Sequence, residues 1–328
     1  MLKQLLLALL IACTAYANPE NACLVMSNAA GTGTGFIVKQ RGGYYLVSNQ
    51  HVINGPAPHK YEKSDGIVLR PLKGWLAGDR DIVIYSLDGT HAHYLEVETE
   101  FDAVALGEEV MIYGNALGEG MRLSEAKIIR KTSSEIEISG GIVPGNSGGP
   151  IIRKKNGKLL AVATYATVHN TQFRSISDYV EAAGLPKVRF YGVRIDTITS
   201  PVDFDLKQFL QEAAQLEADA KQLDRAAIML IMLSMKLGAD LSPEISQYVR
   251  RAEQSHHRAL SMLEPSGLYP GTYSPVAVNA FRRASDPLFS ITAKPVSYIH
   301  RNKQTALEND QKFLWSTYAK LLRSVPVR

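Results

Sequence analysis

One serine of this chain lies in a turn crowded with glycine: the stretch Gly145–Pro150 reads G-N-S-G-G-P, with Ser147 at its centre. Glycine tolerates positive φ and lets a second backbone approach closely, so such a turn can present a hydroxyl beside converging backbone N–H groups. That arrangement suits acyl transfer, in which an oxygen nucleophile attacks a carbonyl and N–H donors stabilise the negative charge. A plain surface turn uses the same residue types. Chemistry at Ser147 therefore requires a base, an orienting acid and a β-rich scaffold elsewhere in the chain.

His51 and Asp81 are the candidate partners of this serine. His51 comes just after a predicted strand, where a neutral imidazole could take the proton from Ser147 and return it to a leaving amine. Asp81 begins an apolar run, and a carboxylate buried there can fix the tautomer of an imidazole. Its alternative role is to cap a turn before the strand. Asp79 is a nearby competitor, but only Asp81 leads directly into the apolar run.

The chain order of the three residues indicates one fold over another. Serine triads occur in three orders on unrelated folds, and His51, Asp81, Ser147 is the order of the chymotrypsin-like fold. An α/β-hydrolase needs the order Ser, Asp, His, with the serine turn between a strand and a helix. Here the turn is followed by a further apolar strand at Pro150 and not by a helix. The α/β-hydrolase alternative is therefore not supported, although His169 lies downstream of Ser147.

The elements that would position these residues are short strands. Between Cys23 and Asp196, short apolar runs alternate with turn signals and show no helical period, which predicts an all-β sandwich or barrel. A hairpin turn is predicted at Arg41-Gly42-Gly43, and residues 169–187 are predicted to form a loop. The predicted strands are 33–39, 44–49, 66–72, 81–87, 109–113, 123–131, 135–139, 158–168 and 188–195.

From about Pro201 the pattern changes to helical spacing. Apolar residues recur at helical intervals across 203–238, and a second helix is predicted over 242–263 and a third over 296–322. A short helix is predicted around 276–284. The sequence thus predicts an all-α C-terminal domain at 201–328, after a β domain at 18–200.

The first 17 residues have the features of an export signal. Lys3 precedes the apolar run Leu5–Ile11, and Ala15-Tyr16-Ala17 fits a cleavage site. In the alternative, Leu10–Cys13 resembles a bacterial lipobox, and Cys13 would become a lipidated first residue that anchors the protein to a membrane. Both routes export the protein, to the periplasm or outside the cell. The only other cysteine is Cys23, so loss or acylation of Cys13 leaves no intrachain disulfide.

Composition excludes several classes of function. A net charge of +4 over 328 residues is mild and does not indicate a nucleic-acid partner. His91 and His93 would share one face of a strand, but the sequence offers no evident third ligand, so we expect no metal. Nothing in the motifs predicts a cofactor.

Four segments resemble motifs of one enzyme group, in the group's own order. They are Thr32–Val38 (its G-S-G-F hairpin), Ser48–Ile53 (T-N-x-H-V), Glu109–Gly118 (I-G-N-P-x-G) and Val143–Pro150 (N-P-G-N-S-G-G-P). Over roughly residues 24–196 the chain therefore resembles a trypsin-like serine peptidase of the chymotrypsin fold, nearest the bacterial HtrA/Deg group.

The resemblance implies two six-stranded antiparallel β-barrels, here followed by the helical domain, and endopeptidase activity. It makes His51 the base, Asp81 the orienting acid and Ser147 the nucleophile, with the backbone N–H groups of Gly145 and Ser147 as the oxyanion hole. The chain departs from the group at Ser139, where an aspartate often stands, and in having helices where a β-rich PDZ domain usually follows. With these departures, the resemblance does not predict a role in protein quality control.

Substrate preference is predicted from three further residues. In this fold specificity depends partly on the residue six before the serine, here the uncharged Gly141, so a preference for Lys or Arg is not indicated. Thr164 and Tyr165 lie on a strand expected to form a pocket wall and to pair with the substrate backbone, and Tyr165 could narrow the pocket. We expect a small or medium apolar residue before the scissile bond.

Two function classes stay open from the residues alone. The first is an exported serine endopeptidase that acts on a protein or peptide. The second is a catalytically silent protein of the same fold that uses its cleft to hold peptides. The helical domain is expected to mediate homo-oligomerisation or to dock a partner.

Overall fold

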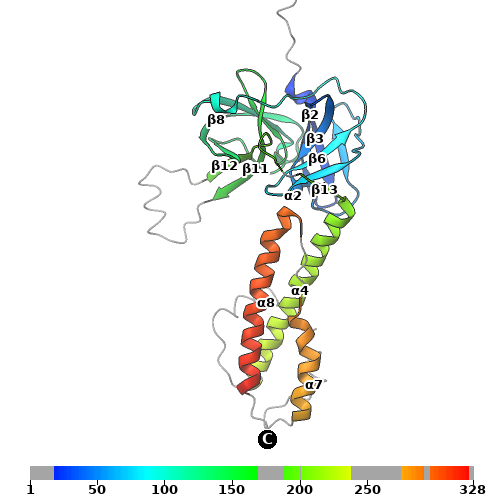
Figure 1. Cartoon of the computed structure of the whole chain (residues 1–328), viewed down its shortest axis with the longest axis vertical. Helices are drawn as coiled ribbons and strands as arrows, with labels where there is room; N and C mark the ends of the chain where they lie inside the picture. Colours follow the sequence, from blue (N-terminus) through cyan, green and yellow to red (C-terminus); the bar gives the residue numbers. More distant parts are fainter. Residues whose placement is uncertain (1–17, 169–187, 200, 238–274, 292–295, 325–328) are drawn as a thin grey trace, which may run out of the picture. The chain divides into compact units, whose positions relative to one another are not determined.

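The computed structural model describes residues 18–168, 188–199, 201–237, 275–291 and 296–324. The chain divides into two compact units, residues 1–206 and residues 207–328. Figure 1 shows the first unit as strands coloured blue to green and the second as helices coloured yellow-green to red. The predicted export signal, the loop at 169–187 and the helix at 242–263 lie outside the described residues.

Seven antiparallel strands form the first sheet, in the order β13-β5-β6-β3-β2-β1-β4. Its β2–β3 hairpin turns at Arg41 and Gly42, whose positive φ values of 49° and 80° fit a two-residue turn that matches the twist of the strands. This confirms the predicted hairpin turn. The elements of this half are η1 Pro19–Ala22, β1 Cys23–Asn28, β2 Gly31–Gln40, β3 Gly43–Ser48, α2 Gln50–Ile53, β4 Lys60–Lys63, β5 Gly74–Ala77, β6 Val83–Leu87 and β13 Pro201–Phe204.

Six further strands close into an antiparallel barrel in the order β10-β11-β12-β9-β8-β7. The serine turn lies between β9 and β10, and β11 continues past the end of its pairing with β10 at Val162 while it stays paired with β12 to Val168. The elements of this half are η2 Phe101–Ala103, β7 Glu109–Gly114, η3 Ala116–Gly118, β8 Arg122–Lys131, β9 Glu135–Ile138, β10 Pro150–Arg153, β11 Leu159–Val168 and β12 Val188–Val193.

The sheet, the barrel and the helices confirm a mainly β fold with C-terminal helices. Closure of the first sheet into a second barrel stays a prediction. The predicted strand at 66–72 is wrong, because its only described pairing is an isolated bridge between Glu62 and Val68. Ile67 and Val68 are 54% and 47% exposed, so their apolar side chains do not mark a buried strand. The two edges of the sheet are instead β4 and β13.

A continuous apolar core joins the sheet to the barrel. Phe36 and Val47 from the sheet belong to the same buried cluster as Ile152, Leu159 and Val162 from the barrel. A second cluster fills the barrel interior around Ile112 and Ile136. Because burial of such side chains contributes about 1.5–3 kcal/mol each, this shared core fixes the sheet and the barrel against one another. Loops from both can therefore form one site.

The second unit is a set of packed helices: α4 Leu206–Leu237, α7 Pro275–Ser285, η6 Asp286–Phe289 and α8 Tyr298–Ser324. Leu216, Leu223 and Leu230 of α4 are buried with Leu307 and Leu314 of α8, and in each helix the leucines recur every seven residues. The helices predicted at 203–238 and 296–322 are thus confirmed, except that residues 203 and 204 belong to β13. None of the helices in the described residues is both long enough and apolar enough to cross a membrane.

Side-chain amides hold the short segment at η6 between the two long helices. Gln222 Nε2 of α4 donates to the carbonyl oxygens of Pro287 at 2.8 Å and Ser290 at 2.7 Å. Gln311 Nε2 of α8 donates to the carbonyl oxygen of Phe289 at 2.8 Å. The Pro287 carbonyl oxygen also accepts from the Ser290 N–H at 3.2 Å, so the two amides add donors at the end of this short 3-10 helix.

Candidate active site

The serine turn depends on glycines at two positions. Gly145 and Gly148 have φ values of 94° and 85°, a region that side-chain-bearing residues rarely adopt. A Cβ on Gly145 would lie 2.0 Å from the carbonyl oxygen of Asn115, and one on Gly148 would lie 2.1 Å from that of Thr34. The turn is therefore packed against neighbouring backbone on both sides of Ser147.

His51 is held by Asp81 through two hydrogen bonds. Its backbone N–H donates to Asp81 Oδ1 at 3.0 Å, and its ring Nδ1 lies 2.5 Å from Asp81 Oδ2. An ionised carboxylate can only accept, so Nδ1 carries a proton and Nε2 of the neutral ring is the acceptor. The His51 side chain is 37% exposed and that of Asp81 18% exposed, so the pair is open to the solvent on one side. The arrangement suits a general base that acts through Nε2.

The competing aspartate faces another partner. Asp79 accepts from Arg80 Nε through both carboxylate oxygens, each at 3.1 Å. Arg80 also donates through Nη1 to the carbonyl oxygen of Arg194. Asp79, whose side chain is 59% exposed, thus pairs with the largely buried Arg80, whereas Asp81 contacts His51.

Two polar residues that the sequence reasoning missed fix the position of Asp81. Gln50 Nε2 donates to the carbonyl oxygens of Ala77, Arg80 and Ile82, which bracket the aspartate. Asn49 Nδ2 donates to the carbonyl oxygen of Asp81 at 2.6 Å and to Thr164 Oγ1 at 3.1 Å. Both side chains are fully buried. Their only signal in the sequence is their position directly before His51 in the S-N-Q-H segment.

The backbone N–H groups of Gly145 and Ser147 have a defined direction. The carbonyl oxygen of Pro144 accepts from Leu117 N–H at 2.7 Å, and that of Asn146 accepts from Gly149 N–H at 2.9 Å. In a planar trans peptide the N–H points opposite to the C=O, so the N–H groups of Gly145 and Ser147 point away from those two partners. Within the described residues, neither N–H donates to a protein acceptor. Two such donors can serve an anion.

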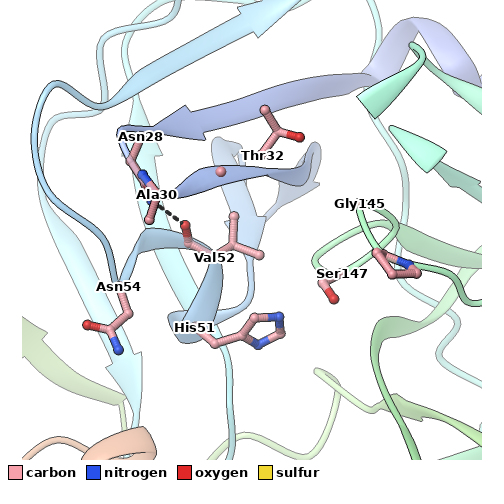
Figure 2. Close-up of a pocket in the computed structure, with 10 residues that line it drawn as sticks. Asn28, Ala30, Thr32, His51, Val52, Asn54, Gly145 and Ser147 are labelled. Carbon is pink, nitrogen blue, oxygen red and sulfur yellow. Dashed lines mark hydrogen bonds between the residues drawn. The ribbon is translucent and has the colours of Figure 1, made fainter. Parts of the chain in front are cut away.

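Ser147 and His51 line the same cavity. It has a volume of about 280 Å³, and Figure 2 shows the Ser147 hydroxyl and the His51 ring on either side of it. Ser147 Oγ lies 3.5 Å from the carbonyl oxygen of Thr164, at the limit of a hydrogen bond. No hydrogen bond among the described residues joins Ser147 Oγ to His51. The remaining lining comes from the β1–β2 hairpin, α2 and the serine turn: Asn28, Ala30, Gly31, Thr32, Val52, Asn54, Pro144 and Gly145.

The three predicted substrate residues lie elsewhere than in this cavity. Gly141 has a φ of 90°, and its carbonyl oxygen accepts from Asn146 Nδ2 at 2.8 Å. Thr164 is buried, and its Oγ1 donates to the carbonyl oxygen of Val162 at 2.8 Å. Tyr165 stacks on Tyr191 with ring centroids 4.8 Å apart. A role of Gly141, Thr164 and Tyr165 in substrate binding stays a prediction.

The first comparison with known proteins concerns the domain family. Residues 33–162 match the family model described as "Trypsin-like peptidase domain". The match includes His51, Asp81 and Ser147, and it begins in the hairpin and ends in β11. The resemblance to trypsin-like serine peptidases drawn from the sequence is thereby confirmed for this part of the chain.

Curated relatives place the resemblance near the HtrA/Do proteases. The Synechocystis sp. protein HhoB is 29% identical over 146 residues, which are 41% of this chain and 34% of the relative. "Protease Do-like 1, chloroplastic" of Arabidopsis thaliana is 24% identical over 192 residues, 55% of this chain and 40% of the relative. The matched part of the chain thus spans less than half the length of each of these two relatives. The predicted nearness to the HtrA/Deg group is confirmed.

The similarity to solved structures is weaker in sequence. The crystal structure of the serine endoprotease from Yersinia pestis is 18% identical, with a TM-score of 0.41, and the alignment covers 55% of this chain and 62% of that one.

Proposed function

We propose that this protein is a serine endopeptidase that hydrolyses peptide bonds through His51, Asp81 and Ser147 and an acyl-enzyme intermediate. The observation that carries the proposal is that His51, bonded to Asp81 at 2.5 Å and 3.0 Å, lines the same cavity as Ser147. The trypsin-like peptidase match and the HtrA/Do relatives support the same chemistry.

The proposed reaction uses each side chain for one task. Ser147 Oγ attacks the substrate carbonyl as His51 Nε2 takes its proton, and Asp81 stabilises the imidazolium that forms. The N–H groups of Gly145 and Ser147 donate to the oxyanion of the tetrahedral intermediate. His51 then gives the proton to the leaving amine, and a water activated by the same imidazole releases the acyl group from Ser147.

For the substrate we propose a protein or peptide with a small or medium apolar residue before the scissile bond. Gly141 brings no charge to the pocket, and a Cβ there would lie 3.0 Å from Ile112 Cδ1, so the position has little room for a side chain. The part of β11 that continues beyond its pairing with β10 would pair with the substrate backbone. Cleavage profiling on a peptide library that returned a strict Lys or Arg preference would overturn this specificity.

Peptide hydrolysis by a matched set of variants tests the proposed function. Wild-type protein is expected to cleave an unfolded protein such as casein, and Ser147→Ala is expected to abolish cleavage with an unchanged melting temperature. Ser86→Ala removes a serine hydroxyl of β6 that, among the described residues, bonds to the backbone of Lys73, and it should retain full activity. Equal cleavage by Ser147→Ala and wild type would exclude Ser147 as the nucleophile.

One observation favours a second function, that of a catalytically silent peptide-binding protein. Ser147 Oγ lies against the carbonyl oxygen of Thr164 at 3.5 Å, and among the described residues it forms no hydrogen bond with His51. In that case wild type and Ser147→Ala would bind the same peptides with equal affinity and leave them intact. Calorimetric titration followed by mass spectrometry of the peptide separates binding from cleavage.

We also propose that the protein is exported, that the first sheet closes into a second barrel, and that the helical unit docks a partner or a second copy. The sequence of residues 1–17 carries the first of these proposals, and mass spectrometry of the mature N-terminus tests it. For the helical unit, Trp315 is 46% exposed on α8. If deletion of residues 207–328 leaves the mass in solution, the solubility and the activity unchanged, docking through this unit is excluded.

A further inference from the structure

A buried threonine of the first sheet is bonded to the serine turn through both its backbone and its side chain. Thr34 of β2 is 0% exposed. Its backbone N–H donates to the carbonyl oxygen of Ser147 at 2.9 Å, and its hydroxyl donates to the carbonyl oxygen of Gly145 at 2.8 Å. Ser48 Oγ donates in turn to the Thr34 carbonyl oxygen at 2.6 Å. All hydrogen-bonding groups of this residue are therefore engaged around the turn that carries the nucleophile.

The same hydroxyl accepts a hydrogen bond from a second turn. Asn115 N–H donates to Thr34 Oγ1 at 2.9 Å, and the side chain of Asn115 donates to Thr32 Oγ1 at 3.1 Å. The Asn115 carbonyl and amide oxygens accept from Gly118 N–H at 3.0 Å and Gly120 N–H at 2.9 Å. The segment from Asn115 to Gly120 is thus a closed turn, and the Thr34 hydroxyl ties it to β2.

This second turn sets the direction of the Gly145 amide. Its Leu117 N–H holds the carbonyl oxygen of Pro144 at 2.7 Å, and the planar peptide then directs the Gly145 N–H the opposite way. Leu117 adopts a φ of 56°, which is unfavourable for a residue with a side chain. Its side chain is 66% exposed, so burial does not offset this cost. If the turn loosened, rotation of the Pro144–Gly145 peptide would replace a donor in the oxyanion hole by a carbonyl oxygen.

We propose that Thr34 is a positioning residue for the oxyanion hole, because its hydroxyl bonds the serine turn and the Asn115–Gly120 turn at once. The inference rests on the proposed peptidase function. Thr34 does not touch the reacting atoms; it acts through Gly145 and through the turn that holds Pro144. Removal of the hydroxyl leaves the Gly145 carbonyl without its donor and the Asn115 N–H without its acceptor.

Paired variants that differ by the hydroxyl alone test the inference. Thr34→Val keeps the shape of threonine but lacks the hydroxyl, whereas Thr34→Ser keeps the hydroxyl. If valine prevents folding, Thr34→Ala and Thr34→Ser form a second pair that differs by the hydroxyl. Because loss of one oxyanion donor lowers kcat about 10²–10³-fold, partial misplacement of the Gly145 donor is expected to lower kcat about 10- to 100-fold with little change in KM. Thr34→Ser should stay within about threefold of wild type.

Binding of a peptide aldehyde gives a readout that a merely structural role would not change. Its adduct with Ser147 places an oxyanion in the hole, so Thr34→Val should weaken it by the same factor as kcat, while binding of the matching non-reactive peptide alcohol stays unchanged. Two results would overturn the inference and leave the peptidase function standing. One is an equal loss of aldehyde and alcohol binding in Thr34→Val. The other is a kcat that is the same in variants with and without the hydroxyl. A wild-type protein that neither cleaves peptides nor forms the aldehyde adduct would overturn both.

Discussion

Replacement of Asp81 by asparagine tests the assignment of the orienting acid, and the structure sets the expected size of the effect. Asp81 accepts from two donors of the same residue, the backbone N–H of His51 at 3.0 Å and the ring Nδ1–H at 2.5 Å. The backbone N–H cannot change its role, so the amide oxygen of asparagine must face it. The amide NH₂ then faces Nδ1, which has to become an acceptor, and the ring proton moves to Nε2.

That change of tautomer removes the base from the side of the ring that must accept the serine proton. In a serine triad, loss of the correct tautomer lowers kcat about 10⁴-fold. We expect Asp81→Asn to lower kcat by about 10³- to 10⁴-fold, which corresponds to about 4 to 5.5 kcal/mol of transition-state stabilisation. KM should change little, because Asp81 does not line the cavity.

The assay is steady-state cleavage of a fluorogenic peptide at pH 8, and Asp79→Asn is the matched control. Asp79 is 59% exposed in its side chain and pairs with Arg80, which is 10% exposed and also donates to the Arg194 carbonyl oxygen and the Thr197 hydroxyl. Loss of the Asp79 charge leaves Arg80 with these two acceptors and leaves the Asp81–His51 bonds in place. Asp79→Asn is therefore expected to retain activity. A large loss in Asp79→Asn, together with nearly full activity in Asp81→Asn, would refute the assignment and the tautomer argument with it.

Three further predictions follow from packing and charge. Gly148→Ala should abolish cleavage, because a Cβ would lie 2.1 Å from the carbonyl oxygen of Thr34; full activity would show that the turn can relax. Burial opposes ionisation of Glu98, but hydrogen bonds from Asn156, the Glu100 N–H and Arg153 lower its pKa from 4.5 to about 2. This carboxylate therefore stabilises the fold above about pH 4.5, and the contribution is lost as the pH falls towards 2. Glu98→Gln should destabilise the protein at pH 7 by about 1–3 kcal/mol and should flatten the pH dependence of the unfolding free energy in that range, whereas an unchanged acid profile would contradict the pKa argument. Burial raises the pKa of the Cys23 thiol, so a maleimide should label Cys23 only after unfolding, and rapid labelling of the folded protein would contradict its burial.

The parts of the fold that the sequence predicts are those specified by local pattern. The β2–β3 hairpin follows from the glycine at its turn, and α4 follows from leucines at helical spacing that prove to be buried. The short strand β5 was not predicted, because it is defined by pairing with β6 and β13 and not by its own residues. The segment 66–72 was wrongly predicted as a strand, because its apolar residues Ile67 and Val68 are exposed.

The same distinction between local sequence signals and long-range contacts applies to the candidate site. His51, Asp81 and Ser147 are singled out by residue type and chain order, and the structure brings His51 and Asp81 into contact. The residues that hold them act through bonds between distant parts of the chain. Gln50 reaches carbonyls about 30 residues away, and Thr34 reaches Gly145, which is 111 positions further on. Such bonds have no local period or motif, so they become visible only in the folded chain.

Covalent labelling of Ser147 tests the central claim most directly. A fluorophosphonate reacts with a serine only where a base activates the hydroxyl and where the site accepts a tetrahedral centre. Intact-mass and peptide mapping should show one adduct, on Ser147, in the native wild-type protein, and no adduct in Ser147→Ala or in heat-unfolded wild type. Failure of the folded wild-type protein to react, or an adduct that persists in Ser147→Ala, would contradict the assignment of Ser147 as the nucleophile of a serine peptidase.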